Sequence, residues 1–439
     1  FAGAFYRFSP YYEKYAQKEK SDLFQLYLLI IHIGIGIVFV LSFAFRHRIT
    51  GQFEVKSPLF ATYYPTVFIF SYLFIIYNTL ELYLFTKGQA IAQSFAREII
   101  IRVIILLFSL CTLYFLSVNQ YIYLYSIHYI IPIGFLLWVI HKRFPIHLGV
   151  PFSKVTSRLW PHMKKMASWG IVQTIVSTGV PVVDTLVIGS FIGLKQVAEY
   201  QIMTYVSTLI HVPLRATIGV LGAKISEQWM NYDLKGIQNT YQRTSMSYLT
   251  FALFASGMVI ANIDLIQKLT GKNIDLNFSI IAVLLFARVL ELSTGLSNLV
   301  IAYSKKWRYE NIISIANIIV AVPLNLIMIR KFGMLGVAYS TLILYVITYS
   351  FRIILLNILY GLFPFSKSSF QLILGFIILV SIMWWGCSHT DSLFLKLIFS
   401  ILFGGIYLLF ALKMKFSEDL NLAFDHLIKR AMSFLKPIL

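Results

Sequence analysis

The sequence predicts an all-α membrane protein that crosses the bilayer many times. Of its 439 residues, 58% are hydrophobic and only 13% are charged, whereas a soluble domain carries about 25% charged residues. Apolar runs of roughly 20 residues recur along the whole chain, and each is long enough to cross a hydrocarbon core of about 30 Å. The two cysteines, Cys111 and Cys387, lie far apart in apolar segments and suggest neither a disulfide framework nor a metal site.

Twelve apolar runs are the expected membrane spans. In chain order they lie near residues 23–45, 59–83, 98–117, 121–140, 170–192, 199–222, 246–266, 277–303, 309–329, 335–360, 370–386 and 392–412. The loops on one side of these spans are short, so no domain is expected there that could hold a soluble catalytic site.

The distribution of basic residues predicts the orientation in the membrane. Of the 37 Lys and Arg residues, 24 lie in the N-terminal segment, in every second loop and in the C-terminal tail, and 8 lie in the alternate loops. Because cytoplasmic loops are enriched in Lys and Arg, we expect a multi-pass protein of the cytoplasmic membrane with both native termini cytoplasmic. The net charge of +19 then indicates contact with anionic membrane lipids, and no nucleic acid is expected as a partner.

The basic loop 141–170 contains six Lys or Arg residues and no acidic residue, and it separates two groups of spans. We therefore expect an N-terminal lobe at 1–150, a six-helix lobe at 151–360, two additional membrane helices at 361–414 and a cytoplasmic amphipathic tail at 415–439. The tail places apolar residues at helical spacing. They are Phe416, Leu420, Ala423, Leu427, Ala431 and Leu435.

The deepest charges are Arg288 and Glu291, within an apolar stretch of the span near 277–303. A charge at the centre of a membrane helix costs roughly 2.5–3.5 kcal/mol and usually faces a bundle interior or a wet cavity. At a spacing of three residues the two side chains share one helix face. Two interpretations remain open: a structural ion pair between helices, or an arginine that gives a substrate cavity its positive potential.

Three further arginines lie within spans. Arg215 follows Pro213, seven residues from the expected cytoplasmic end of its helix, and it is a second candidate for a substrate cavity. Arg102 and Arg352 lie nearer the cytoplasmic ends, where snorkelling of the guanidinium to the interface is the better explanation.

Asp184 is the only acidic residue in its span, which makes it a candidate coupling site for H⁺ or Na⁺. The alternative is a packing role against a nearby hydroxyl or arginine. Glu291 and Glu81 are the other candidates for a coupling or ion-pair role. Glu81 lies near a cytoplasmic end, however, where exposure at the interface is at least as well supported as such a role. Asn311, Asn317 and Asn325 share one span and are expected to form hydrogen bonds between helices.

Several kinds of function lack support in the sequence. It has no phosphate-binding GxxxxGKS loop and no HExxH helix, so ATP-driven transport and zinc proteolysis are not indicated. It also has no potassium-channel filter motif. We expect no enzyme, no bound cofactor and no metal site.

Two stretches carry a resemblance to a known family. The segment 167–229 resembles the seventh and eighth helices of polysaccharide-export flippases, in which a helix with the pattern D-x-L-x-I-G-x-x-x-G precedes V-x-x-Y, a proline and a Ser-Glu turn. The segment RKFGMLGVAYSTLI (330–343) is similar to the turn into the family's twelfth helix. The matching residues of the first segment are Asp184, Ile188, Gly189, Gly193, Val197, Tyr200, Pro213, Ser226 and Glu227.

The resemblance implies a MATE-like bundle of two six-helix lobes with two extra helices, fourteen in all. Because twelve spans are visible and the chain starts at Phe1 with FAGAFYRF, we expect that the first helix and most of the second are missing. The implied substrate is an oligosaccharide on a polyprenyl diphosphate, moved by alternating access through a cationic cavity between the lobes. The candidates to line this cavity are Arg288 and Arg215, with Arg102 or Arg352 as further candidates. Arginine suits such a headgroup because guanidinium binds phosphate oxygens in pairs. Polysaccharide-assembly proteins are the implied protein partners.

Four alternatives differ in what they require. A MATE-like exporter of cationic drugs would need acidic groups in its cavity, whereas the arginines within the spans equal or outnumber the acids. A lipid II flippase would share the mechanism and the headgroup chemistry. A membrane glycosyltransferase or polymerase would need a sizeable outside loop. A purely structural membrane protein would leave the deep charges without a purpose.

Overall fold

The computed structural model is all-helical throughout the part of the chain that it describes, which confirms the predicted all-α class. The described residues are 5, 8–9, 12, 22–51, 53–55, 57–143, 153–271, 274–390, 392–422 and 424–425. The chain divides into two compact units, Phe1–Ser177 and Thr178–Leu439. This division falls inside one continuous helix, α9 (Lys154–Phe191), which includes residues 154–170 of the predicted basic loop.

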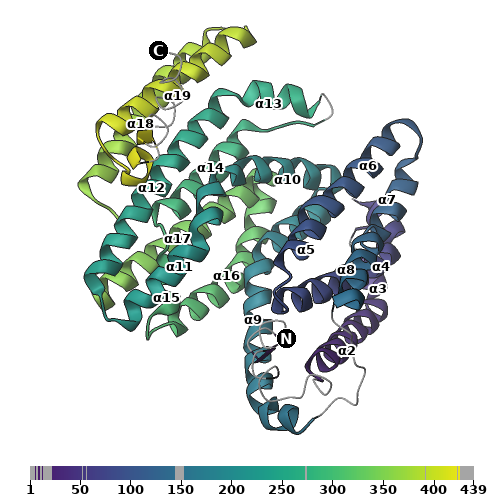
Figure 1. Ribbon diagram of the computed structural model, residues 1–439. Helices are drawn as coiled ribbons and strands as arrows, with labels where there is room; N and C mark the ends of the chain where they lie inside the picture. Colours follow the sequence, from purple (N-terminus) through teal and green to yellow (C-terminus); the bar gives the residue numbers. More distant parts are fainter. Residues whose placement is uncertain are drawn as a thin grey trace, which may run out of the picture. The chain divides into compact units, whose positions relative to one another are not determined.

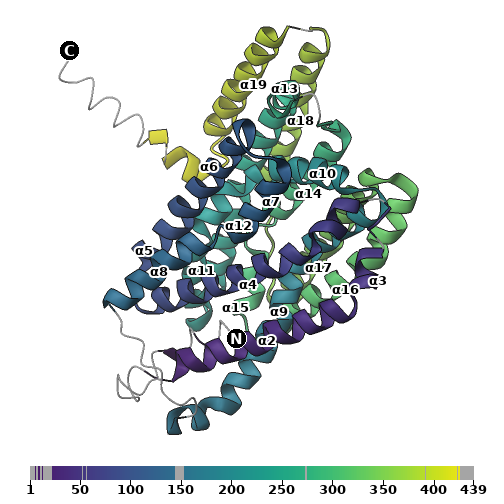
Figure 2. The ribbon, with the colours of Figure 1, turned by 90° about the vertical axis from the view of Figure 1, so that its right-hand side faces the viewer.

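Among residues 22–143, as far as the structure describes them, the first unit contains eight consecutive helical segments before α9 (Figures 1 and 2). They are α2 (Leu23–Ala44), α3 (Arg46–Gly51), α4 (Pro58–Thr86), α5 (Ala90–Phe95), the π-helical segment η2 (Ala96–Ile100), α6 (Ile101–Tyr114), α7 (Val118–Ile127) and α8 (Ile130–Arg143). Its core is rich in aromatic residues. Phe24, Tyr77, Leu84, Tyr129 and Leu136 are buried there.

The second unit continues from α9 to the C-terminal helices. Its segments are α10 (Leu194–Thr208), the 3₁₀ segment η3 (Leu209–His211), α11 (Val212–Met230), α12 (Leu234–Ala261), α13 (Ile263–Thr270), α14 (Phe278–Ser293), α15 (Ser297–Tyr303), α16 (Arg308–Phe332), α17 (Met334–Tyr360), α18 (Lys367–Ser388) and α19 (Leu393–Lys413). Its main core gathers buried aliphatic side chains, among them Ile188, Met203, Leu284, Val300 and Val337.

Most of the predicted spans reappear as long apolar helices. Within the described residues, eight helices can cross a membrane by length and composition, and two bent pairs, α10–α11 and α14–α15, raise the number to ten. The remaining two predicted spans, near 98–117 and 170–192, are helical too and lie in η2–α6 and α9. The protein is therefore a multi-pass membrane protein.

The last two membrane helices, α18 and α19, pack against α12 within the second unit. Leu253 of α12 shares a buried cluster with Leu372 of α18 and with Phe403 and Tyr407 of α19, and Figure 1 shows α18 and α19 beside α12. The start of the predicted amphipathic tail joins the same cluster through the buried Phe416. Of the other expected tail positions Leu420 packs against this cluster, whereas Ala423, Leu427, Ala431 and Leu435 lie outside the described residues.

A glycine produces the break between α14 and α15. The axes of these helices differ by 43°, and Gly295 between them has φ +57°, a conformation that costs an L side chain free energy. A Cβ at this position would also lie 2.6 Å from Ser245 Oγ and 2.9 Å from the Ser245 backbone N of α12. The sequence STG (293–295) therefore ends α14 one turn after Glu291.

Candidate functional site

The deep pair of charges forms a network inside the second unit. Arg288 Nη1 donates to Glu291 Oε2 at 3.0 Å, as the spacing of three residues predicted. His211 Nε2 lies 2.8 Å from the same oxygen. Arg288 also donates to the Tyr345 hydroxyl of α17, and its guanidinium lies 5.2 Å from the centroid of that ring. We call these four residues the Glu291 set.

The Glu291 set is enclosed but not fully dry. The side chains of Arg288 and Glu291 are 17% and 22% exposed, and that of His211 is 9% exposed. Arg288 Nε and His211 Nδ1 are buried and have no hydrogen-bond partner among the residues that the structure describes. Because unpaired buried polar atoms are costly, the set has capacity for a further ligand.

Helix breaks on two elements bring the Glu291 set together. Glu291 lies in the last turn of α14, and the Thr294 hydroxyl donates to its carbonyl at 2.8 Å. His211 closes the 3₁₀ segment η3, directly before α11, which starts Val212-Pro213. Proline suits the first turn of a helix because its missing N–H is not needed there. Thus α14 ends, and α10 changes to a short 3₁₀ segment, next to the residues that meet.

A second carboxylate is held by neutral groups alone. Asn325 Nδ2 of α16 donates to Asp184 Oδ1 at 2.8 Å, and the Thr341 hydroxyl of α17 donates to Asp184 Oδ2 at 3.3 Å. Asp184 is 8% exposed and Asn325 is fully buried. We call these three residues the Asp184 set. The hydrogen bond predicted for Asn325 is thereby confirmed.

The Asp184 set joins the two stretches that carry the family resemblance, since Asp184 belongs to the first and Thr341 to the second. The Asn325 Oδ1 and Tyr200 hydroxyl oxygens are buried and lack a partner within the described part of the chain. The charge of Arg288 acts on Asp184 through space. Carboxylate, amide and hydroxyl oxygens are the ligands that hard cations prefer, so the set fits a small cation.

Arg352 forms a closed ion pair, which corrects the prediction that it snorkels. Its Nε donates to Glu310 Oε2 of α16 at 3.1 Å, and its Nη2 donates to the other oxygen. The two side chains are only 10% and 14% exposed. A two-point bond satisfies the guanidinium in place, so it has no need to reach the interface. One helical turn earlier on α17, Thr348 bonds Asn317 at 2.7 Å, as expected for Asn317.

The other two arginine candidates are exposed. Arg102 pairs with Glu98 one turn before it, and their side chains are 72% and 52% exposed. Arg215 lies on an exposed face of α11, and the described residues give it no ion pair. Arg215 is therefore open to an external anion, whereas snorkelling of Arg102 stays a prediction.

Glu81 is buried in the first unit, so the expected exposure at the interface is wrong. It is 3% exposed, and it accepts from Arg97 Nη2 at 2.6 Å and from Gln93 Nε2 at 3.2 Å. Arg97 lies in the π-helical segment η2, whose extra residue per turn shifts the side chains that follow. Local spacing along α4 gave no sign of this partner.

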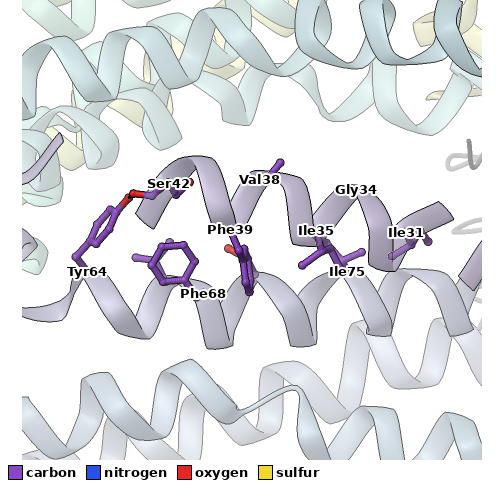
Figure 3. A pocket seen from close by; sticks show the side chains of 11 residues that line it. Ile31, Gly34, Ile35, Val38, Phe39, Ser42, Tyr64, Phe68 and Ile75 are labelled. Carbon is purple, nitrogen blue, oxygen red and sulfur yellow. The ribbon is translucent and has the colours of Figure 1, made fainter. Parts of the chain in front are cut away.

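The first unit also contains an apolar groove between α2 and α4. It has a volume of about 530 Å³, and its lining is almost wholly apolar. Figure 3 shows the two helices side by side with Ile35, Phe39 and Phe68 between them. None of the sequence-predicted site residues lines it.

The sequence missed three members of these networks: His211, Tyr345 and Glu310. No chemical partner of His211 is evident in the sequence, because Glu291 lies 80 positions away. The one available signal was the placement of His211 directly before a helix-starting proline. Within the described residues no group of three or more His, Cys, Asp or Glu side chains could hold a metal ion.

Comparison with known proteins gives the fold. No protein-family model matches the chain, and no curated protein matches it. A solved structure of the lipid II flippase MurJ, in an inward closed conformation, matches with a TM-score of 0.72 and 15% sequence identity, over 94% of this chain and 90% of that chain. The chain therefore has the fold of that flippase, which agrees with the predicted MATE-like bundle.

Proposed function

We propose that this flippase-like fold translocates an oligosaccharide linked to a polyprenyl diphosphate across the cytoplasmic membrane, by alternating access. The observation that carries the proposal is Arg288, a guanidinium at membrane depth whose Nε has no partner among the described residues. A diphosphate headgroup needs cationic partners there, and guanidinium provides paired donors that stay charged. Arg215, exposed on α11 of the same unit, would give a second contact.

A lipid II flippase is the second candidate, and the matching MurJ structure favours it. Both substrates present a diphosphate on a polyprenyl chain, so the two arginines would serve either one. A MATE-like exporter of cationic drugs is less well supported, because each of the deep carboxylates Asp184, Glu291 and Glu310 already accepts hydrogen bonds from protein groups.

We further propose that the Asp184 set binds the coupling ion, Na⁺ or H⁺. The set has a carboxylate, a hydroxyl and the unpartnered Asn325 Oδ1, and it lacks a basic residue among its direct hydrogen-bond partners. A cation bound there would compensate a charge that is expensive to bury alone. Arg288, which acts on Asp184 through space, would link ion binding to the headgroup.

Transport in proteoliposomes tests the function. The purified chain should move a fluorescent lipid-linked oligosaccharide between leaflets, and parallel vesicles with lipid II show which glycan it accepts. Arg288→Ala and Arg215→Ala should each lower the rate at least about tenfold, since a hydrogen bond to a charged group is worth roughly 1.5–3 kcal/mol. Arg330→Ala, an exposed arginine at the other end of α16 from Glu310, is the matched control and should transport normally. Normal transport by both test variants would refute the role of the arginines.

The coupling proposal has its own measurement. Transport should depend on a sodium or a proton gradient, and Asp184→Asn should remove that dependence. A gradient response that survives in Asp184→Asn would place the coupling site elsewhere, whatever substrate is moved.

A further inference from the structure

One oxygen of Glu291 serves two partners. Glu291 Oε2 lies 2.8 Å from His211 Nε2 and 3.0 Å from Arg288 Nη1. The two partners come from different spans, η3 and α14. With Nε2 carrying its hydrogen, His211 donates to an oxygen that Arg288 also binds, so the carboxylate keeps a partner when either one leaves.

Arg288 is the partner that can leave. Its Nε is buried without an acceptor among the described residues, so the guanidinium is only partly used in the present arrangement. Tyr345 supports the same group through its hydroxyl and its ring face. An incoming anion would find a cation with unused donors, held at one edge by Glu291.

When Arg288 leaves, the buried carboxylate of Glu291 loses its charged partner, which costs free energy. Removing the partner of a buried charge is strongly unfavourable, and that cost would subtract directly from the affinity of Arg288 for any anion. A donor that remains on Glu291 lowers the cost. Among the described residues, His211 Nε2 is a second nitrogen within hydrogen-bonding distance of this carboxylate, beside Arg288 Nη1.

We infer that His211 is a positioning residue that keeps Glu291 paired while Arg288 exchanges Glu291 for the diphosphate of the substrate. The inference rests on the proposed function for the identity of the anion. It adds a residue that contacts no substrate and yet sets how tightly Arg288 binds it. Without His211, Arg288 would stay locked to Glu291.

Inorganic pyrophosphate is the probe, and its affinity is measured by calorimetry on the full chain in nanodiscs of neutral lipid. Wild type should bind it, and Arg288→Ala should abolish binding. His211→Ala should weaken binding about tenfold or more, whereas His211→Gln, which retains an N–H donor, should stay within about threefold of wild type. His211→Phe keeps a ring without a donor and should behave like His211→Ala, and it replaces that variant if the alanine protein is unstable.

A double-mutant cycle separates this role from a merely structural one. In a Glu291→Gln background no buried carboxylate needs a partner, so adding His211→Ala should change the affinity by less than about twofold. The inference is overturned if His211→Ala binds like wild type, or if it weakens binding equally in both backgrounds. It is overturned as well if wild type binds no pyrophosphate.

Two further measurements show whether the role of His211 or the proposed function is at fault if an expected result is not obtained. A polyprenyl diphosphate in the nanodisc should compete with free pyrophosphate, and a lack of competition would overturn the assignment of this site to the lipid headgroup. Transport by wild type is measured in parallel. If transport is absent while the cycle behaves as expected, the proposed function fails and the role of His211 toward Arg288 stands. If transport is present while the cycle fails, only the role of His211 falls.

Discussion

The Asp184 and Glu291 sets each hold a buried carboxylate, but they hold it with different kinds of side chain. Both place a carboxylate inside the second unit, yet Asp184 is held by an amide and a hydroxyl, and Glu291 is held by an arginine and a histidine. No cation bonds Asp184 directly, and Arg288 acts on it only through space, whereas Arg288 bonds Glu291 and compensates its charge. The difference indicates opposite ligands: a cation completes the first set, and an anion competes for the arginine of the second.

The largest effect that this comparison predicts is the loss of Arg288. Arg288→Ala should lower the free energy of unfolding in detergent by about 3–5 kcal/mol, because it removes the charge that compensates a mostly buried carboxylate. Thermal or chemical unfolding of the purified protein measures it.

Glu291→Gln is the matched control for that change. In the Glu291→Gln background the same arginine substitution should cost less by about 2 kcal/mol or more, since no buried anion is left without a partner. Equal costs in the two backgrounds would show that Arg288 stabilises through packing alone, and the comparison of the two sets would lose its electrostatic basis.

The next effect concerns the break that places Glu291 at the end of α14. Gly295→Ala should destabilise the protein by about 1–3 kcal/mol, because φ is +57° and a Cβ would meet Ser245. Gly405 lies inside α19, and a Cβ there would meet no atom within 4 Å. It is the matched control, and its alanine variant should be at least as stable as wild type. An unaffected Gly295→Ala protein would show that the break does not need glycine.

How much of this could be read from the sequence depends on how local each feature is. The spans follow from runs of apolar residues, and the Arg288–Glu291 pair follows from a spacing of three on one helix. Both are local patterns, and both are present in the structure. For Asn317 and Asn325 the sequence predicted the type of interaction but not the partner, because an amide inside a membrane usually forms a hydrogen bond with another helix.

The remaining partners are set by tertiary packing and leave little trace in the sequence. Arg352 lies 42 positions from Glu310, so spacing alone favoured snorkelling, and the hairpin of α16 and α17 decided otherwise. Glu81 was expected near the interface, yet a π-helical segment brings Arg97 over it. His211 and Tyr345 reach the Glu291 set from two other helices. The spacing of residues along the sequence does not show which side chains from distant helices come into contact.

A smaller change is expected when Asp184 loses its charge. Asp184→Asn should alter the free energy of unfolding by less than about 1 kcal/mol, because an amide can still accept from Asn325 and its new N–H donors can meet the Thr341 oxygen. Unfolding of the purified protein without Na⁺ measures it. A loss as large as that of Arg288→Ala would mean that the charge of Asp184 is already compensated in the resting protein, and the two sets would no longer differ.

The smallest effect lies outside the membrane, where the C-terminal segment meets α12. Asp419 accepts from Arg243 Nε at 3.0 Å and from Ser247 Oγ at 2.8 Å. Partial burial alone would raise the pKa of Asp419, but these hydrogen bonds and the charge of Arg243 outweigh it and hold the pKa below the ordinary aspartate value. A lowered folded-state pKa stabilises the protein above the unfolded-state pKa, and this contribution disappears as pH falls through the folded-state value.

Asp419→Asn should therefore cost well under 1 kcal/mol at neutral pH, since the Asp419 side chain is 50% exposed and solvent screens the pair. The difference between Asp419→Asn and wild type should begin to shrink near pH 4, the ordinary aspartate pKa, and should vanish only when pH falls below the lower folded-state pKa. Unfolding midpoints of both proteins between pH 3 and 7 measure it, and salt should reduce the difference at neutral pH because it screens exposed charges. A difference that persists at low pH would assign the effect of Asp419 to its shape and not to its charge, unlike the effect expected for Arg288.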